Sequence, residues 1–571
     1  MTYRPEFIDE INQYGASDFV LRPRYFTGTP YVGDQGLSFM GGTYDGIRYP
    51  AGLLSISPIS RRVRPYGWQA SHGTCEVTID PSTIDPDSLR RGSVWQLIAF
   101  TRTASAALWT ATLDRVRLRK DGSGFRYVLS LIDIAAMQAR ADTGTDLSLF
   151  GYAGTVTTET NGAGASATTY RVASTADFYA RTEAGTRGLL LVKPDSSADP
   201  FLARWTAKTS TRFTVINADQ YGTTKTNVPV GSELVSLGYF EGHPSRFAQE
   251  LYTGSSPVGT RSLADSGFLR LPEDLWSQSD SESEVARTGD LEYAFWCDTP
   301  IQMDSAADWL GIGGFFVTMH HGRVTCRTVP DLGAYWITTV TSPTYPGPDR
   351  YLLSMSDLAV RGPGSAPIRL ETDLYGSGQW QTEYLQLAVE TQAGTAKVPS
   401  LASAEKRGCP TLSEYRIDLN NTSVELSEMV FTFPGIGSKM EKPTWIDQKV
   451  RSSRVRAAHQ MPQGGPAMYA TTANNSELAN RLSPFIVHAP QIVTATFAGP
   501  HPEYTLGDSV KFDDSWDLPA ACGGTIAGLQ GMIAGTSMDV LGLTHTLTIW
   551  IPPQRLIPFS AAGSTLRDPQ G

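Results

Sequence analysis

A histidine and a cysteine three residues apart are the first side chains of this sequence that could act together. A thiol beside an imidazole base is the arrangement of a nucleophilic catalyst, and His72 and Cys75 have that spacing. Cys75, however, begins a segment in which Cys75, Val77 and Ile79 alternate with polar residues, as on a half-buried β-strand. Free cysteine is among the most buried residue types. We therefore interpret Cys75 as a buried strand thiol.

An adjacent pair of histidines has the residue type that binds metal ions. On a strand, the side chains of His320 and His321 would point to opposite faces of the sheet, so they could not easily ligate one ion. We interpret the pair as part of a turn before Gly322.

An acidic group near the end of the sequence could offer oxygen ligands to a hard cation. It consists of Asp513, Asp514 and Asp517. The group lacks both the six-oxygen spacing and the glycine of a calcium loop. We interpret it as a solvated strand end.

The sequence contains none of the short motifs that mark common catalytic or cofactor sites. It has no Gly-x-Ser-x-Gly, no P-loop, no GxGxxG and no HExxH. Carboxylate pairs for glycoside hydrolysis come from separate strands, and nothing in the sequence singles out such a pair. We expect no catalytic residue, no metal ion and no cofactor, and we predict that the protein is not an enzyme.

Arginines at alternate positions form a charged stripe. Arg115, Arg117 and Arg119, followed by Lys120, recur with the period of a strand and so share one of its faces. Such a stripe is usually a solvated face. In an assembly it could instead pair with the carboxylates of a neighbouring subunit, so these three arginines are the candidate inter-subunit contacts. A second basic run consists of Arg61, Arg62 and Arg64.

The arginine stripe lies in a strongly marked β-hairpin, Leu108–Asp133. Apolar residues alternate as far as Leu113 and resume at Val116 one step out of phase, which predicts a β-bulge. The loop Asp121–Gly124 contains glycines that suit positive φ. After it, the alternation resumes and places Leu129 on the predicted buried face.

Short alternating segments separated by Gly, Pro, Asn and Asp recur from end to end, so the predicted fold class is mainly β. A tight hairpin is predicted at Asp45-Gly46, helical turns within Asp80–Gly92, and a short amphipathic helix around Phe247. The acidic stretch Ser277–Asp290 is predicted to be an exposed loop and the first site of limited proteolysis.

Length and composition narrow the possible functions. A chain of 571 residues should hold about three to five domains. With 47 basic and 57 acidic residues the net charge is -10, which argues against a protein that binds nucleic acid by neutralising phosphates. No segment has the apolar length of a membrane span or a signal peptide, so we expect no stable membrane insertion. The five cysteines lack a CxxC spacing and are expected to be reduced thiols.

Changes in composition divide the chain into four expected domains. They are an N-terminal β-barrel-like domain, 1–150, an inserted Thr-rich β module, 151–240, a middle β-rich domain, 241–440, and a C-terminal β-barrel-like domain, 441–571. No strict sequence repeat is evident, although both ends carry the pattern of a β-barrel-like unit.

Several of these segments, in this order, resemble the tail hub, or baseplate hub, proteins of tailed bacteriophages and the related gene transfer agents. The resemblance rests on the turn, strand and hairpin over 80–133, on the Thr-rich module around "SATTYRVASTADFYA", and on "LGYFEGHPSRFAQELYTG". It also rests on the closing segments "YTLGDSVKF" and "QGMIAGTSMDVLGLTHTLTIWI".

The resemblance implies a structural virion protein without catalysis. Two barrel-like domains per subunit, arranged as a trimer, would mimic a six-fold ring that joins the tail tube and distal tail protein to the tail tip or fibre. The tape measure protein is a further implied partner, and DNA would pass through the ring without stable binding. The implied location is the virion, at the tail tip or baseplate, after synthesis in the cytoplasm of a bacterial host.

Two other functions compete with this one. A receptor- or carbohydrate-binding tail protein would use the module 151–240, with exposed aromatic residues such as Trp205 and Tyr221 as the contact. A tail-tip hydrolase of cell wall or polysaccharide would need two carboxylates in a cleft, or a metal ion.

Overall fold

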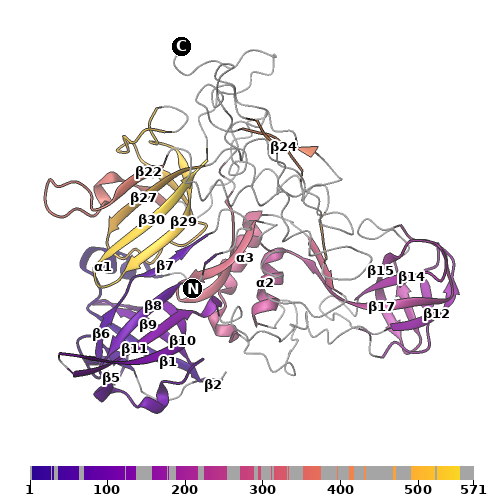
Figure 1. Ribbon diagram of the computed structural model, residues 1–571, viewed down its shortest axis with the longest axis horizontal. Helices are drawn as coiled ribbons and strands as arrows, with labels where there is room; N and C mark the ends of the chain where they lie inside the picture. The colour runs from indigo at the N-terminus through magenta and orange to yellow at the C-terminus, as the bar shows by residue number, and fades with distance from the viewer. Residues whose placement is uncertain are drawn as a thin grey trace, which may run out of the picture.

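The fold is mainly β, as the sequence predicts, and of the residues that the structure describes 53% are in strands and 14% in helices. Large antiparallel sheets and one nearly closed, barrel-like sheet hold the strands together (Figure 1). The computed structural model describes residues 3–26, 29–30, 36–63, 70–71, 73–122, 124–136, 157–176, 178, 188–216, 224–253, 271–288, 293–297, 310, 314–330, 332, 351–373, 395–396, 411–416, 430–432, 467–470, 490–520 and 524–552.

Four consecutive strands form what we call the N-terminal strand set. They are β8 (Thr74–Ile79), β9 (Val94–Phe100), β10 (Ser105–Asp121) and β11 (Gly124–Asp133). They pair antiparallel in the order β9-β10-β11-β8. The predicted hairpin is confirmed as β10 and β11, and the predicted bulge as a register shift between Leu113 and Arg115. The apolar alternation is confirmed too, because Leu129 is fully buried.

Shorter elements precede this set and flank it. They are α1 (Pro5–Tyr14), β1 (Asp18–Phe26), β2 (Thr29–Pro30), β3 (Leu37–Ser38), β4 (Gly42–Tyr44), β5 (Ile47–Tyr49), β6 (Leu53–Ile56) and β7 (Ile59–Arg62). Strand β1 pairs with β9, while β6 and β7 pair with β8. Asp45 and Gly46 turn β4 into β5 with positive φ at both residues, so the predicted tight hairpin is confirmed. The predicted helical turns are the 3-10 helices η1 (Pro81–Thr83) and η2 (Pro86–Ser88).

Four strands near the other end of the chain form the C-terminal strand set. They are β27 (Gln491–Ala498), β28 (Ser509–Phe512), β29 (Gln530–Asp539) and β30 (Thr544–Ile551). They pair antiparallel in the order β28-β29-β30-β27. Strands β21 (Tyr351–Leu353) and β22 (Leu370–Asp373) pair with β28 and β27, respectively. The C-terminal sheet therefore recruits residues from before position 441, where the sequence places its domain boundary.

The two strand sets belong to one sheet. Strand β7 pairs antiparallel with β29 over four residues of each strand, which joins both sets into a single sheet of 15 strands. At this joint the hydroxyl oxygens of Ser60 and Ser537 lie 2.7 Å apart. Figure 1 shows the C-terminal strands directly above the N-terminal ones, with β7 between them.

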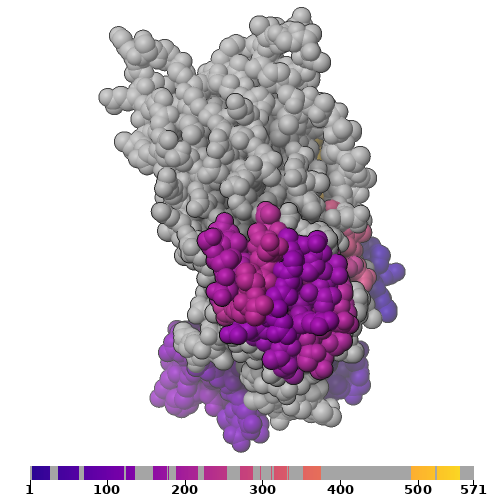
Figure 2. All heavy atoms as spheres, turned by 90° about the vertical axis from the view of Figure 1, so that its right-hand side faces the viewer, coloured from indigo at the N-terminus to yellow at the C-terminus, as the bar shows by residue number. Residues whose placement is uncertain are grey.

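The Thr-rich segment folds as a module with its own core. Its strands are β12 (Thr157–Ala163), β13 (Thr169–Arg171), β14 (Gly188–Lys193), β15 (Phe201–Thr209), β16 (Arg212–Val215) and β17 (Val228–Gly242). Tyr170, Trp205 and Phe213 are fully buried in this core. The module lies apart from both strand sets, at the right in Figure 1 and facing the viewer in Figure 2.

One strand carries the chain from the module into the middle of the molecule. The boundary predicted at residue 240 falls inside β17, whose later residues pair with β18 (Tyr293–Cys297). Tyr239, from this later part of β17, and Leu237, which pairs with Leu189 of β14, are buried in the main core rather than in the module core. The structural limit of the module thus lies earlier in β17.

A shorter deletion than the one suggested by composition should remove the module without unfolding the rest. Thr157 lies opposite Val235, so their Cα atoms are about 5 Å apart and a two-residue Asn-Gly turn can replace residues 158–234. We expect this variant to remain folded by circular dichroism and gel filtration, with some loss of stability because it also removes Leu189, Leu191 and Leu202, which pack in the main core. Deleting residues 151–239 should instead unfold the chain, because it removes Leu237 and Tyr239. Equal loss of structure in both variants would show that the module is integral.

The middle of the chain packs two helices against a hairpin. The helices are α2 (Pro244–Thr253) and α3 (Gln278–Thr288), and the hairpin consists of β19 (Phe315–His320) and β20 (Arg323–Thr328). Helix α2 is the predicted amphipathic helix. The other described strands of this part are β23 (Thr395–Ala396), β24 (Thr411–Arg416), β25 (Val430–Thr432) and β26 (Ala467–Ala470).

The prediction of an exposed acidic loop over Ser277–Asp290 is wrong. Residues 278–288 form helix α3 instead, in which Ser281 and Glu284 are buried. Glu284 meets Arg327 of β20, so a charge that looks solvated in the sequence is neutralised inside the protein. Because this helix packs against the core, we no longer expect it to be the first site of proteolysis.

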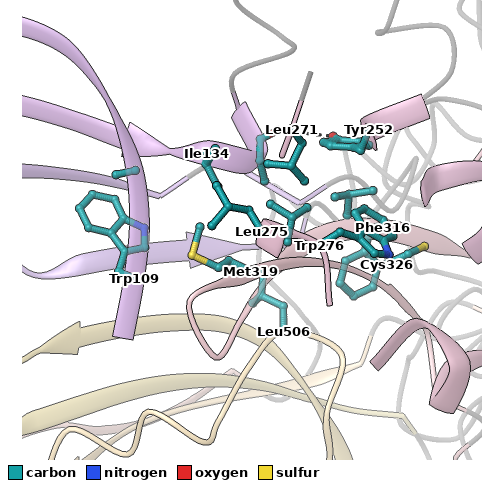
Figure 3. Close-up of a cluster of buried hydrophobic side chains, with 14 of the residues drawn as sticks. Trp109, Ile134, Tyr252, Leu271, Leu275, Trp276, Phe316, Met319, Cys326 and Leu506 are labelled. Carbon is teal, nitrogen blue, oxygen red and sulfur yellow. Dashed lines mark hydrogen bonds between the residues drawn. The ribbon is translucent and has the colours of Figure 1, made fainter. Parts of the chain in front are cut away.

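The main hydrophobic core lies where the three parts meet. Figure 3 shows Trp109 of β10, Tyr252 of α2, Met319 of β19 and Leu506, which precedes β28, around one buried junction. Each is less than a tenth exposed. Burial of such side chains contributes about 1.5–3 kcal/mol apiece, so this junction fixes the N-terminal, middle and C-terminal parts relative to one another.

Candidate assembly surface

The three candidate arginines lie on a stretch of β10 that has a strand on only one side. Strand β9 accompanies β10 only as far as Thr112, whereas β11 accompanies it as far as Asp121. Within the described part of the chain, no strand pairs with the other edge of β10 from Arg115 to Asp121. We call this stretch the free edge of β10. Such an edge presents backbone N–H and C=O groups that can pair with another strand.

The free edge has a basic face and an apolar face. Arg115, Arg117 and Arg119 are all exposed on the outer face. Arg117 forms an ion pair with Glu76 of β8, in which the two side chains are 43% and 58% exposed, so solvent keeps the contribution of the pair below about 1 kcal/mol. On the opposite face Leu118 is 60% exposed, because the hairpin continues past the end of the core.

The end of the hairpin combines apolar surface with excess positive charge. Phe125 is 54% exposed, and the Nζ atom of Lys120 lies 5.6 Å from the centre of its ring. Arg119 stands opposite Arg126 on β11, and like charges in such a pair repel each other. A strand with acidic and apolar side chains, placed beside this end of the hairpin, would cover the exposed apolar surface and reduce the repulsion between the arginines.

The second basic run has a structural role at its first position. The guanidinium of Arg61 donates two hydrogen bonds to the Asp133 carboxylate, at 2.7 and 3.1 Å. Asp133 is buried and also accepts from the Trp109 indole N–H and, at 2.7 Å, from the Gly73 backbone N–H. Arg61 therefore fixes the joint between β7 and β11. Arg62 is exposed, and Arg64 lies outside the described residues.

Cys75 is the buried strand thiol that the sequence predicts. It is 3% exposed, and its thiol donates to the Ser57 carbonyl at 3.1 Å. Burial raises the pKa of the Cys75 thiol to about 11, which keeps it protonated and weakly nucleophilic. His72 lies outside the described residues. Cys326 is also buried.

The two adjacent histidines form a turn before Gly322, as the sequence predicts. His321 has φ +50°, and so the two ring centres lie 3.4 Å apart. His320 Nδ1 is 3.1 Å from the Asp280 carboxylate on α3. Burial would raise the pKa of Asp280, but His320 and a hydrogen bond from Ser277 outweigh burial and hold that pKa below its usual range.

Buried neutral histidines should make the stability of the fold fall in acid. Burial lowers the pKa of His321 to about 2 and that of His545 to about 3. Below pH 6.5 the unfolded chain therefore binds protons that the folded chain does not, and stability is lost as the pH falls from about 6.5 towards 3. Each histidine contributes a slope of about 1.4 kcal/mol per pH unit.

The contribution of His545 can be isolated by substitution. Its Nδ1 lies 3.0 Å from the His501 carbonyl, and the amide of asparagine can donate at that position. We expect His545→Asn to flatten the pH dependence of the urea midpoint between about pH 6 and pH 4. Parallel curves for variant and wild type would contradict the assignment.

The acidic group near the C-terminal strands behaves as a structured strand end. The Asp513 carboxylate accepts from the Ser515 backbone N–H at 2.9 Å and from its hydroxyl, and these bonds lower its pKa. Among the described residues, no three His, Cys, Asp or Glu side chains are grouped so that they could hold a metal ion. The described helices also include none that is long and apolar enough to cross a membrane.

The expectation that Trp205 is an exposed contact residue is wrong. Its side chain is fully buried between β14 and β16, 5.6 Å from the Phe213 ring centre to centre. Tyr221 lies outside the described residues. The described large aromatic side chains of β13 to β16 are therefore buried in the core of the module.

The structure contains a buried ion-pair network that the sequence did not predict. Arg327 of β20 lies 3.3 Å from Glu284 of α3 and also contacts Asp508. All three side chains are at most 2% exposed. Asp508 in turn accepts from the Thr505 backbone N–H at 2.9 Å. The network ties the middle of the chain to the C-terminal strand set, and its residues are 43 and 181 positions apart along the sequence.

A polar cleft of about 700 Å³ opens beside α1 and the turn between β9 and β10. Several of its lining residues are basic: Arg4, Arg22, Arg24, Arg102 and Arg323. Arg24 is paired with Asp274 at 2.7 Å, while the buried Nε of Arg22 has no hydrogen-bond partner in the described structure. Guanidinium groups in a cleft can hold a carboxylate or a phosphate.

Comparison with known proteins gives distant structural likenesses. No family model and no curated protein matches the chain. A 43 kDa tail protein of prophage MuSo2 from Shewanella oneidensis is 10% identical, with 93% of this chain and 98% of that chain covered and a TM-score of 0.30. A tail protein from Neisseria meningitidis MC58 is 8% identical, with 93% and 96% covered and a TM-score of 0.32.

A further likeness is to a chain in the virion of a native gene transfer agent particle. It is 13% identical, with 41% of this chain and 83% of that chain covered and a TM-score of 0.19. The similar structures are thus tail proteins and a virion. All three TM-scores are too low to carry an argument about this chain.

Proposed function

We propose that this protein is a structural component of a bacteriophage tail, and within the tail its hub. Three subunits would form a ring between the tail tube with its distal tail protein and the tail tip or fibre, with the tape measure protein as a further neighbour. The role requires no catalysis. The segments quoted above that resemble hub proteins support this assignment, and so does one independent observation from the fold.

That observation is an internal repeat of strand order. The N-terminal set pairs as β9-β10-β11-β8 and the C-terminal set as β28-β29-β30-β27. If β8 corresponds to β27, the next three strands correspond in turn, and every pairing within each set is antiparallel. The same arrangement of four strands therefore occurs twice in the chain.

The correspondence extends to the strands before each unit and to details within it. Strand β6 pairs with the end of β8, and residues 358–359 pair with the end of β27. The segments that follow, β7 and β22, pair with the starts of β8 and β27. Gly92 and Gly507, just before β9 and β28, both have φ +84°. Strands β10 and β29 each carry one bulge against the following strand.

A subunit with two copies of one unit suits the symmetry of a tail hub. Three such subunits present six similar units, which match a six-fold tube on one side, while the subunits themselves keep three-fold symmetry for the tip. The net charge of -10 would let DNA pass through the ring without binding to it.

Electron microscopy and mass measurement test the assignment. The purified full chain should form a trimer by light scattering after gel filtration, and its images should show a ring with three-fold symmetry and six density lobes. When virions are labelled with an antibody to the chain, the label should be found at the tail tip. A monomer at high concentration, or label elsewhere on the virion, would overturn the assignment.

Glycan binding is the second candidate function, and the structure weakens its basis. It relied on exposed aromatic residues in the module, and Trp205 is buried. We therefore keep the hub as the proposed function.

A further inference from the structure

We propose that neighbouring subunits join by antiparallel pairing between the free edge of β10 in one subunit and the outer edge of β22 in the next. The inference rests on the proposed ring and names the contact that closes it. The partner is a second copy of this chain, and the contact continues the sheet from one subunit to the next.

The joint inside each subunit provides the template. In the C-terminal set, β28 pairs with β29 over residues 530–532, a bulge follows between Ile533 and Gly535, and β7 then fills the edge over residues 535–538. In the N-terminal set, β9 pairs with β10 over residues 105–112, and a bulge follows between Leu113 and Arg115. The next stretch is the free edge. The position that β7 fills on β29 is thus unfilled on β10 within the described structure.

Strand β22 is the counterpart of β7 and so the expected occupant. It pairs with β27 on one side and ends the sheet on the other, since no described strand lies beyond it. Within the subunit, β7 of the first unit pairs with β29 of the second. Around a ring, β22 of the second unit would pair with β10 of the next subunit's first unit, and all six joints would then be of one kind.

The two edges also match in their faces. At the existing joint the polar residues Ser60 and Ser537 meet on one face, and Ile59 lies opposite Met538 on the other. On β22, Glu371 and Asp373 are exposed on one face, where Glu371 also forms a solvent-exposed ion pair at 3.1 Å with Arg369, just before the strand. Leu370 packs towards the C-terminal core on the other face. Continuing the same faces would place these carboxylates beside the arginines of β10.

Exposed apolar residues lie on both edges as well. Leu118 is 60% exposed on the free edge, and Ile368, just before β22, is 45% exposed. Leu118 is on the face opposite the arginines, and Ile368 lies two residues before Leu370. Pairing of the two edges would cover both side chains together with the unpaired backbone groups.

Charge reversal tests the contact in the full-length protein. Arg119→Glu leaves the Arg117–Glu76 pair intact and faces Arg126, so the subunit should stay folded. We expect Arg119→Glu and Glu371→Arg each to weaken the trimer by at least about tenfold in the concentration at which it dissociates, and the double variant to regain most of this loss. Arg212→Glu, an exposed strand arginine of the module, is the matched control and should assemble as wild type does.

Cross-linking tests the same contact without relying on charge. Equal amounts of Arg119→Cys and Glu371→Cys subunits are mixed, and a short bismaleimide should join them into covalent dimers that form from neither variant alone. Rings that form normally in both charge variants and give no cross-link would overturn this inference and leave the hub function standing. A wild-type chain that forms no ring would overturn both.

Discussion

Replacing Arg327 by methionine should lower the free energy of unfolding by about 3–5 kcal/mol. The substitution removes the positive charge that Glu284 and Asp508 share and leaves both carboxylates buried without it. A buried charge without a partner costs more than the pair itself contributes. Because these side chains come from α3 and from the loop before β28, the loss should loosen the C-terminal strand set from the middle of the chain.

Urea unfolding followed by tryptophan fluorescence measures the effect. The matched control is the triple variant Glu284→Gln, Arg327→Met, Asp508→Asn, which removes all three charges and should recover part of the lost stability. If Arg327→Met alone were as stable as wild type, the carboxylates would have to be hydrated, contrary to their burial. A triple variant no more stable than the single one would assign the loss to packing rather than to charge.

Leu129→Ala should cost about 2–5 kcal/mol, since it opens a cavity in addition to losing transfer energy. Leu129 is fully buried on β11, between Val116 of β10 and Val77 of β8. Leu118 lies on the same hairpin and the same face, but is 60% exposed, so Leu118→Ala should change subunit stability by about 0.5 kcal/mol or less.

Thermal melting compares the two variants at a concentration that keeps the subunits separate. Under this condition a role of Leu118 in assembly does not affect the melting temperature. A similar shift in both would mean that the hairpin end is packed against the subunit. A tolerant Leu129 would contradict its position in the core.

The hairpin could be predicted from the sequence because its signals are local. The period of two, the phase shift before Val116 and the glycines of the loop all act within 26 residues, and β10 and β11 follow them. The tight turn at Asp45-Gly46 was predictable for the same reason. These features depend on backbone conformation more than on distant partners.

The acidic helix could not be predicted, because distant residues decide it. Glu284 is tolerated inside the protein only because Arg327 reaches it from another strand. The strongly polar composition of α3 therefore favours a loop when it is considered alone. The turn at His320 and His321 was predictable, but the contact between their rings was not, because it depends on the positive φ of His321, a conformation that is uncommon for residues other than glycine.

The repeat of strand order is invisible in the sequence for a different reason. It is a property of which strands pair, and the corresponding strands share little beyond a glycine before a valine-containing strand. The candidate arginines were predictable as a stripe, but their unpaired edge was not, because it depends on where β9 ends relative to β11.

The pairing of β7 with β29 cannot form until most of the chain has been synthesised. Ser60 and Ser537 are 477 positions apart, and ribosomes add about 5–20 residues per second. The edge of β7 must therefore wait roughly half a minute to a minute and a half before its partner strand exists. Contacts so distant in sequence form slowly, and a waiting strand edge is open to wrong partners on neighbouring nascent chains. A chaperone that holds the N-terminal part should raise the yield of correctly folded chain, and synthesis of the N-terminal part alone should give aggregates.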